Sequence, residues 1–188
     1  MRKIGIYGGS FDPIHHAHLI LARAAREQLG LEKVIFVPAA VSPFKDTPVA
    51  SSDTRWSMLR AAIQGEPAFT VDDCELRRAP PSYAIDTVEE IRAREGDAEM
   101  YYLIGQDNVP ALGKWHRFNE LNKLVRFVVL DRAGTEMKHP YEVVRRKIDI
   151  SATEIRNRVA SGHSIRYLVP TAVDEIIRQG SLYREQVT

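Results

Sequence analysis

The fold of this chain is decided by residues 8–18, which read GGSFDPIHHAH. The stretch begins where the apolar run 4–7 stops, and a helical pattern takes over at Leu19. A glycine turn, two histidines three residues apart and a helix start therefore lie at the carboxyl end of a predicted strand. Ligands of open α/β sheets bind at that end, where glycines and a helix start present backbone N–H groups to an anion. The stretch predicts a phosphate site, with His15 and His18 placed to contact the phosphate.

Outside this stretch, short apolar runs alternate with helical patterns along the chain. Strands are predicted at residues 4–7, 33–38, 69–71, 100–104, 127–130 and 148–150. Helices are predicted at residues 17–29, from an N-cap at Asp53 to about 64, from an N-cap at Ser82 to about 94, and in the tail after Ser151 and after Pro170. The intervening residues 39–52 and 75–81 are predicted loops. The alternation predicts an α/β fold, a Rossmann-like doubly wound parallel sheet with a helical C-terminal part, in a single domain over residues 1–188.

Composition and charge argue against nucleic acid and membranes as binding partners. The 188 residues hold 26 Lys and Arg against 25 Asp and Glu, so the net charge of +1 gives no bulk attraction to nucleic acid or to an anionic membrane. No apolar run approaches the ~18 residues of a membrane span. The one cysteine, Cys74, has no internal disulfide partner, and a cytoplasmic location is expected. The oligomeric state, including a homo-oligomer, is left open.

The segment SATEIR at residues 151–156 is a second strong local signal, because it follows a predicted strand and opens an amphipathic helix. Ser151 and Glu154 fit a capping box. The hydroxyls of Ser151 and Thr153, with Arg156 one turn later, also fit a second anion site at a helix N-terminus. Two phosphate sites at strand ends suit a triphosphate chain.

Three further positions allow both a functional and a structural interpretation. Asp107, in Gly105-Gln106-Asp107 after a predicted strand, suits either a ribose-binding carboxylate or a helix N-cap. Trp115 suits either stacking on a flat heterocycle or anchoring of its own loop. Lys45, in the proline-containing loop after the second strand, suits either an amine over the crevice or a solvated surface lysine.

A metal site at the two histidines is not expected. His15 and His18 would need a third and a fourth ligand, and no Cys or Glu stands nearby at zinc-like spacing. Phosphate binding needs only the glycines and the helix N-terminus, which are present. We therefore expect no protein-bound metal.

Taken together, the motifs resemble the nucleotidyltransferase superfamily of the histidine-x-glycine-histidine type, and within it the branch that acts on nicotinate mononucleotide. The resemblance covers nearly the whole chain in order. It is carried by GGSFDPIHHAH, VPAAVSPFK, RWSML, ELRRAPPSYAIDT, LIGQD, KWHRF, DRAG, ISATEIRNRV and SIRYLVPTAV. It implies adenylyl transfer from ATP to nicotinate mononucleotide, giving nicotinate adenine dinucleotide and pyrophosphate, with Mg²⁺ carried by the ATP.

The resemblance also implies a role for particular residues. The implied catalytic residues are His15, His18 and Lys45. The implied ATP-binding residues are Gly8, Gly9, Ser10, Phe11, Gly105, Asp107, Ile150, Ser151, Thr153 and Arg156. The implied binding residues for the nicotinate nucleotide are Tyr83, Ala84, Thr87, Trp115 and His116.

Two departures from the family pattern matter. Ala17 replaces the motif glycine, which fits if that residue is helical. Ala84 stands where relatives usually carry threonine, so a hydroxyl contact to the nicotinate end is missing. Alternative functions are adenylyl transfer to nicotinamide mononucleotide or pantetheine phosphate, and nucleotide binding by a regulator without turnover. Amino-acid activation by a class I synthetase is excluded by the short chain and the lack of a KMSKS-like loop.

Overall fold

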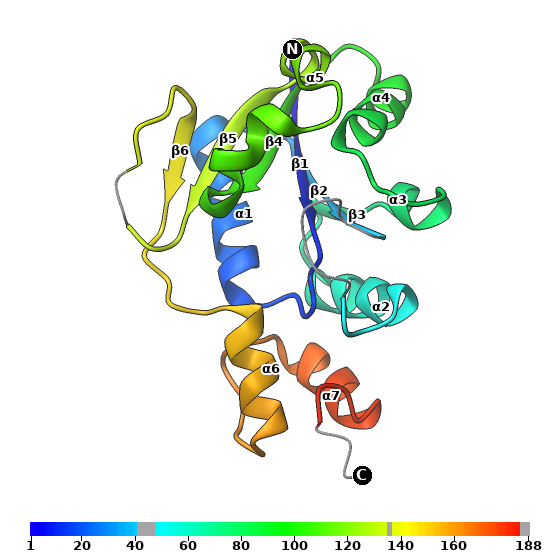
Figure 1. Cartoon of the computed structure of the whole chain (residues 1–188), viewed down its shortest axis with the longest axis vertical. Coiled ribbons are helices and arrows are strands. Elements are labelled where there is room, and N and C mark those ends of the chain that lie inside the picture. The colour runs from blue at the N-terminus through cyan, green and yellow to red at the C-terminus, as the bar shows by residue number, and fades with distance from the viewer. Residues whose placement is uncertain (41–47, 135–136, 185–188) are drawn as a thin grey trace.

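The computed structural model describes residues 1–40, 48–134 and 137–184, and its centre is a parallel sheet of six strands (Figure 1). The strands lie in the order β3-β2-β1-β4-β5-β6. Their bounds are β1 Arg2–Gly9, β2 Lys33–Pro38, β3 Phe69–Val71, β4 Ala98–Gly105, β5 Arg126–Asp131 and β6 Glu142–Arg145. Every paired neighbour runs parallel, so the predicted α/β, Rossmann-like doubly wound sheet is confirmed.

The helices follow the strands in alternation. They are α1 His16–Leu29, α2 Ser52–Ala62, α3 Cys74–Arg77, α4 Ala84–Glu95, the 3₁₀ helix η1 Gln106–Lys114, α5 Phe118–Leu124, α6 Ala152–Ala160 and α7 Thr171–Gln179. Helices α6 and α7 form the predicted helical C-terminal part, and Figure 1 shows them together beyond the carboxyl ends of the strands. In the described ranges, no helix is long and apolar enough to cross a membrane.

The sheet is buried on both faces because its side chains alternate between two apolar clusters. Ile4 and Ile6 of β1 belong to one cluster, and Tyr7 belongs to the other. The first cluster takes its helical members from α3, α4, η1 and α5, and the second takes them from α1, α2, α6 and α7. Strands that are apolar on both sides are typical of parallel sheets. The C-terminal helices therefore share a core with the sheet.

The last predicted strand was wrong. Residues 148–150 form no strand, and β6 lies instead at Glu142–Arg145. The Arg145 Nε donates to buried Asp131 Oδ2 at 2.7 Å, which fixes β6 beside the end of β5. The N–H groups of Arg146 and Ile148 still donate to the carbonyls of Asp131 and Arg132, so the chain follows β5 without extending the ladder.

Two helix boundaries and one predicted loop also differ from prediction. The N-cap of α2 is Ser51, whose Oγ accepts from the Thr54 N–H at 3.2 Å, and Asp53 lies in the first turn. Helix α4 begins after Tyr83, because the Ser82 Oγ accepts from the Ala40 N–H instead of capping the helix. The predicted loop 75–81 instead opens within the short helix α3.

Candidate active site

The turn after β1 brings backbone, not side chains, to the carboxyl end of the sheet. A Cβ placed on Gly8 would lie 2.7 Å from the hydroxyl oxygen of Tyr102, so a larger residue would displace that ring. Phe11 follows with a positive φ of 48°, a conformation that non-glycine residues adopt only where the surroundings enforce it. Its side chain is buried, and its ring centroid lies 5.1 Å from that of His18. The turn therefore has a fixed shape, with Gly8, Gly9 and Ser10 facing a pocket.

The two histidines predicted to contact phosphate lie together at the start of α1. His15 is the N-cap, and its ring stacks on His18 with 3.7 Å between centroids. The His15 N–H donates to His18 Nδ1 at 3.3 Å, so a neutral His18 carries its proton on Nε2. Burial, helped by the charges of Arg132 and His16, lowers the pKa of His15 to about 3. His15 is therefore neutral at physiological pH.

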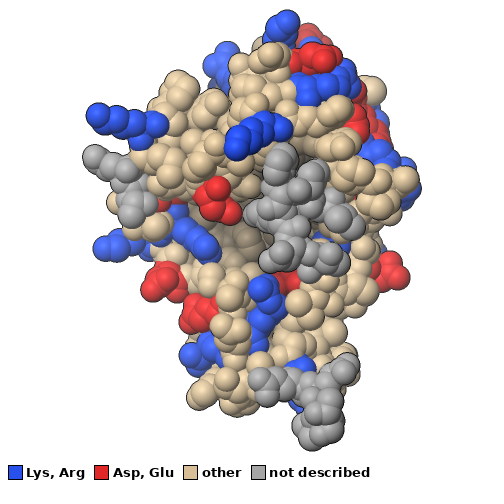
Figure 2. All heavy atoms as spheres, in the orientation of Figure 1, with Lys and Arg blue, Asp and Glu red and all other residues tan. Residues whose placement is uncertain are grey.

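The SATEIR segment reaches the same place from the other end of the chain. Ser151 caps α6, since its Oγ accepts from the Glu154 N–H at 3.1 Å. The Arg156 guanidinium donates from Nη1 to the Asp12 carbonyl at 2.7 Å and from Nη2 to Thr153 Oγ1 at 3.3 Å. The structure thus brings the two predicted anion sites side by side. The face drawn in Figure 2 is hollowed near its middle, with Lys and Arg side chains close by.

The ends of β4 and β5 complete this edge. A Cβ on Gly105 would collide with the Asp107 carboxylate, so a larger residue at this position would require that side chain to move. The pKa of Tyr7 is raised by burial and by the charge of Asp107, which places that carboxylate near β1. The carbonyl of Ile150 accepts from Arg132 Nη1 at 2.7 Å. Arg132 was not predicted as a site residue, although its charge also acts on His15.

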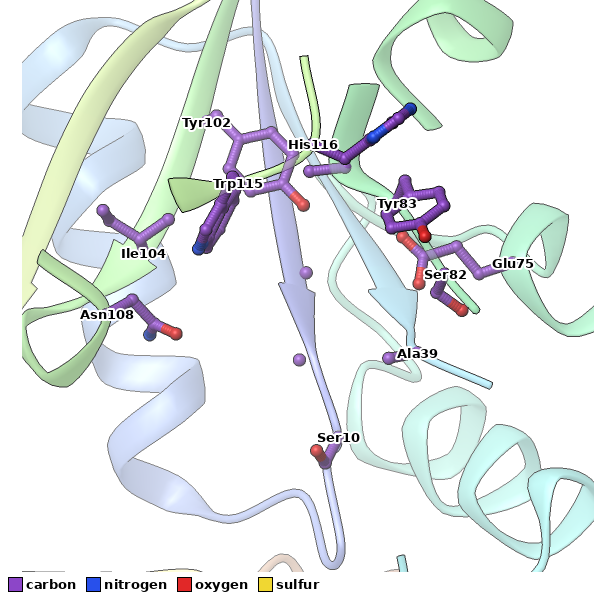
Figure 3. A pocket seen from close by; sticks show the side chains of 13 residues that line it. Ser10, Ala39, Glu75, Ser82, Tyr83, Tyr102, Ile104, Asn108, Trp115 and His116 are labelled. Carbon is purple, nitrogen blue, oxygen red and sulfur yellow. The ribbon is translucent and has the colours of Figure 1, made fainter. Parts of the chain in front are cut away.

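The pocket continues from the glycine turn into an aromatic chamber (Figure 3). Trp115 is half-buried and meets Tyr102 edge-on, with 6.0 Å between centroids. Tyr83 stacks on His116 at 4.3 Å. The lining residues are Gly8, Gly9, Ser10, Ala39, Glu75, Ser82, Tyr83, Ala84, Tyr102, Ile104, Asn108, Trp115 and His116. The structure therefore joins four of the five predicted acceptor-binding residues to the phosphate turn in one cavity.

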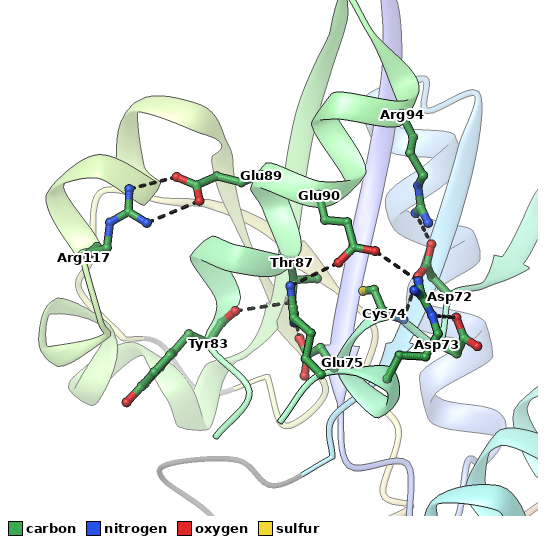
Figure 4. Close-up of polar contacts among 12 residues, drawn as sticks. Asp72, Asp73, Cys74, Glu75, Tyr83, Thr87, Glu89, Glu90, Arg94 and Arg117 are labelled. Atoms are coloured by element: carbon green, nitrogen blue, oxygen red, sulfur yellow. Dashed lines mark hydrogen bonds and ion pairs between the residues drawn. The ribbon is translucent and has the colours of Figure 1, made fainter. Parts of the chain in front are cut away.

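Thr87, the fifth, lies behind the pocket wall and is fully buried. Its hydroxyl donates to Glu75 Oε1 at 2.7 Å and accepts from Arg78 Nη2 at 2.5 Å (Figure 4). Burial raises the pKa of Glu75, and hydrogen bonds from Thr87 and Ser82 oppose that rise. Glu75 lines the pocket but was not predicted, because its sequence neighbours give no sign of burial. Ion pairs such as Arg117 with Glu89 brace the outer side of α4 (Figure 4).

Two predictions remain to be placed. Lys45 lies outside the described residues. Among the residues that are described, no three His, Cys, Asp or Glu side chains gather where they could hold a metal ion.

The comparisons with known proteins agree on one family. A family model described as cytidylyltransferase-like matches residues 6–158. The probable nicotinate-nucleotide adenylyltransferase of Herpetosiphon aurantiacus is 39% identical, over 97% of this chain and 99% of that protein. The protein of the same name from Geobacillus thermodenitrificans is 42% identical, over 97% of this chain and 87% of that protein.

Solved structures share the fold. The nicotinic acid mononucleotide adenylyltransferase of Plasmodium falciparum complexed with NaAD matches with a TM-score of 0.80 and 19% identity, over 97% of this chain and 98% of that one. The same protein complexed with APC matches with a TM-score of 0.78 over the same shares. At this identity the likeness concerns the fold alone.

Proposed function

The chain belongs to the cytidylyltransferase-like family, and we propose that it transfers the adenylyl group of ATP to nicotinate mononucleotide. The products are nicotinate adenine dinucleotide and pyrophosphate, in a step of NAD biosynthesis. One observation carries the proposal: a single cavity runs from the glycine turn at Gly8 and Ser10 to the aromatic chamber around Trp115. Such a cavity suits a phosphate on one side and a flat ring on the other.

The reaction requires no general base. The nucleophile is a phosphate oxygen of the acceptor, already an anion, which forms a bond to the α-phosphorus of ATP while the bond to pyrophosphate breaks. The protein contributes position and stabilises negative charge at the α-phosphate and at the leaving group. His18 suits this role because its Nδ1 accepts the His15 N–H, which puts the proton of the neutral ring on Nε2. Burial keeps His15 neutral, and we propose that it also donates to the phosphates without a charge.

The arrangement of strand ends supports proposals for the remaining ATP contacts. We propose that Ser10, Ser151, Thr153 and Arg156 contact the phosphates, and that Lys45 lies near them. Asp107 is proposed to accept hydrogen bonds from the adenosine ribose. The residues proposed to line the rest of the nucleotide site are Gly8, Gly9, Phe11, Gly105 and Ile150.

ATP carries a divalent cation in this chemistry, and we propose Mg²⁺. The donors at the site are imidazoles, hydroxyls and a guanidinium, which suit phosphate oxygens better than a cation. Mg²⁺ retains water and is commonly held by substrate phosphates with few protein ligands. The ion would lower the charge of the leaving pyrophosphate, while the protein's donors hold the phosphate oxygens.

The acceptor is proposed to bind in the aromatic chamber. Trp115 would stack on the pyridine ring, and main-chain N–H groups near Tyr83 and Ala84 at the start of α4 would meet its carboxylate together with His116. Thr87 would support this segment from behind through its bond to Glu75. The buried free thiol of Cys74 suits a reducing compartment, and the cytoplasm is the proposed location.

Pyrophosphate release with ATP and Mg²⁺ tests the proposal directly. The purified chain is offered nicotinate mononucleotide, nicotinamide mononucleotide or pantetheine phosphate in parallel. Release with nicotinate mononucleotide well above the other two is the expected result. Preference for another acceptor changes the substrate, and ATP binding without release from any of them indicates a regulator instead of an enzyme.

A further inference from the structure

The carboxylate of Asp12 is a buried junction behind the phosphate turn, and only 5% of this residue is exposed. Its Oδ2 accepts from the Val49 N–H at 2.7 Å, and its Oδ1 accepts from the Ala50 N–H at 3.1 Å. The same Oδ1 accepts from the hydroxyl of Tyr183 at 2.6 Å. Residues 37, 38 and 171 positions away along the chain therefore meet on one carboxylate.

The backbone of the same turn is held from two further sides. Buried Arg55 donates from Nη1 to the Ser10 carbonyl at 2.8 Å. Arg156 donates to the Asp12 carbonyl at 2.7 Å. Every polar group named here points at residues 10–12, which lie between the pocket-lining glycines and His15. The position of this turn thus depends on partners that do not line the pocket themselves.

Tyr183 reaches this junction at a conformational cost. After α7 ends, Ser181 and Tyr183 both adopt positive φ, at 48° and 60°. Such conformations are unfavourable for non-glycine residues and persist only where the surroundings enforce them. Tyr183 is 9% exposed and belongs to the apolar cluster that also holds Phe11. The C-terminal segment therefore folds back at a cost to bring one hydroxyl to Asp12.

We propose that Tyr183 is a positioning residue for adenylyl transfer, acting through Asp12 on the turn that carries Ser10 and leads to His15. The Tyr183 hydroxyl is the third hydrogen-bond donor to the Asp12 carboxylate, beside the Val49 and Ala50 N–H groups. The packed C-terminal segment thereby helps to hold the phosphate turn in the position that binding requires. The turnover assay of this inference rests on the proposed function, whereas ATP binding can be measured without any acceptor. Failure of the Tyr183 proposal can therefore be distinguished from failure of the proposed function.

The test is Tyr183→Phe in the full-length chain, with Ile177→Val as the matched control. Ile177 is buried on α7, so its variant loosens the packing of the same segment and leaves the Tyr183 hydroxyl in place. Both variants are assayed well below their unfolding midpoints. We expect Tyr183→Phe to lower kcat by more than about threefold and to weaken ATP binding measured by calorimetry without acceptor. In Tyr183→Phe, the KM for nicotinate mononucleotide should change by less than about twofold. The control Ile177→Val should keep its kcat within about twofold of the unchanged chain.

A second pair of variants tests the route through the carboxylate. If Tyr183 acts through Asp12, the double variant Asp12→Ala, Tyr183→Phe has the kcat of Asp12→Ala alone, because Asp12→Ala already removes the oxygen that accepts from the Tyr183 hydroxyl. A folded Tyr183→Phe with kcat within about threefold of the unchanged chain overturns the proposal. So does an Ile177→Val variant that loses as much kcat as Tyr183→Phe. Full additivity of the two single-variant losses in the double variant also overturns it.

Hydrogen exchange of the unchanged chain replaces these assays if Tyr183→Phe fails to fold. The N–H groups of Gly180, Ser181 and Leu182 are bonded to carbonyls of α7, which makes their exchange a measure of segment opening. Slower exchange on addition of ATP and Mg²⁺ supports the coupling. Exchange unaffected by saturating ATP contradicts it.

Discussion

At the scale of single residues, His18 is the side chain whose loss should lower turnover most. Replacing it by Ala removes the Nε2–H donor and should reduce kcat by about 10²–10³, the usual cost of one charge-stabilising donor. Stability should change little, because His18 is only partly buried. The measurement is kcat at saturating substrates alongside a thermal unfolding curve. Exposed His163 supplies the control, and a folded His18→Ala enzyme with nearly normal kcat would refute the assignment.

His15 should make stability depend on pH. Its pKa is lowered from 6.5 to about 3 in the folded protein, mainly by burial, so the unfolded chain takes up a proton between these values and the folded chain does not. Its contribution is therefore present above pH 6.5 and is lost as the pH falls toward 3, by about 1.4 kcal/mol per pH unit. Urea unfolding at pH 7 and at pH 5 should show a smaller drop for His15→Asn than for the unchanged chain. Parallel drops would contradict the neutral, buried state of His15.

Residues whose role depends on local sequence were predictable, and residues whose role depends on distant partners were not. The glycine turn, His15 and His18 are neighbours in the sequence, so one strand end and one helix start place all of them. Glu75 is held as a buried pocket residue by hydrogen bonds from Thr87, twelve positions later, and from Ser82. Asp12 gains its importance from Tyr183 at the other end of the chain. No periodicity in the sequence encodes either contact.

At the scale of elements, the start of α6 should act on ATP more than on the acceptor. Arg156→Ala removes the bonds that join α6 to the Asp12 carbonyl and to Thr153. We expect calorimetry to show weaker ATP binding, with the KM for nicotinate mononucleotide much less affected. Arg158→Ala is the matched control, because that arginine is on the same helix and its Nε donates to the Ser164 carbonyl instead of to the Asp12 turn. An unchanged ATP Kd in folded Arg156→Ala would remove α6 from the nucleotide site.

The elements that were predicted wrongly show what local patterns leave out. Residues 148–150 have an apolar pattern suited to a strand, but the edge of β5 is already paired with Glu142–Arg145 and fixed by the ion pair of Arg145 with Asp131. The available pairing edge of β5, and not the strand propensity of a segment, decides which segment extends the sheet. Similarly, η1 contains Pro110, which argues against an α-helix in the sequence but is compatible with a 3₁₀ helix.

At the scale of the whole molecule, the site exists because parallel strands end at the same edge. The carboxyl ends of β1 and β4 lie beside one another in the sheet, and each is followed by a proposed nucleotide contact. The acceptor pocket draws on β1, α4 and η1 together. A net charge of only +1 is compatible with binding two anionic nucleotides because the donors are concentrated locally, at His18, Arg156 and the helix starts.

Preference for the acid over the amide on the pyridine ring is a property of this whole arrangement. Trp115 would stack on either ring, so it cannot discriminate between them. We propose that discrimination comes from N–H donors near Tyr83 and Ala84 and from His116, which would satisfy a carboxylate. An amide directs its own NH₂ at one of these donors and leaves buried N–H groups unpaired, which is costly.

The measurement is kcat/KM for nicotinate mononucleotide against nicotinamide mononucleotide, at saturating ATP and Mg²⁺. We expect the acid to be preferred in the unchanged chain. Ala84→Thr should widen the preference, because it adds a hydroxyl donor to a pocket-lining position without touching the ATP side. Glu89→Gln, on the outer face of the same helix, should leave the ratio unchanged. Equal values for the two acceptors, or preference for the amide, would overturn the nicotinate assignment and leave adenylyl transfer standing, because the phosphate turn and α6 are independent of the ring substituent.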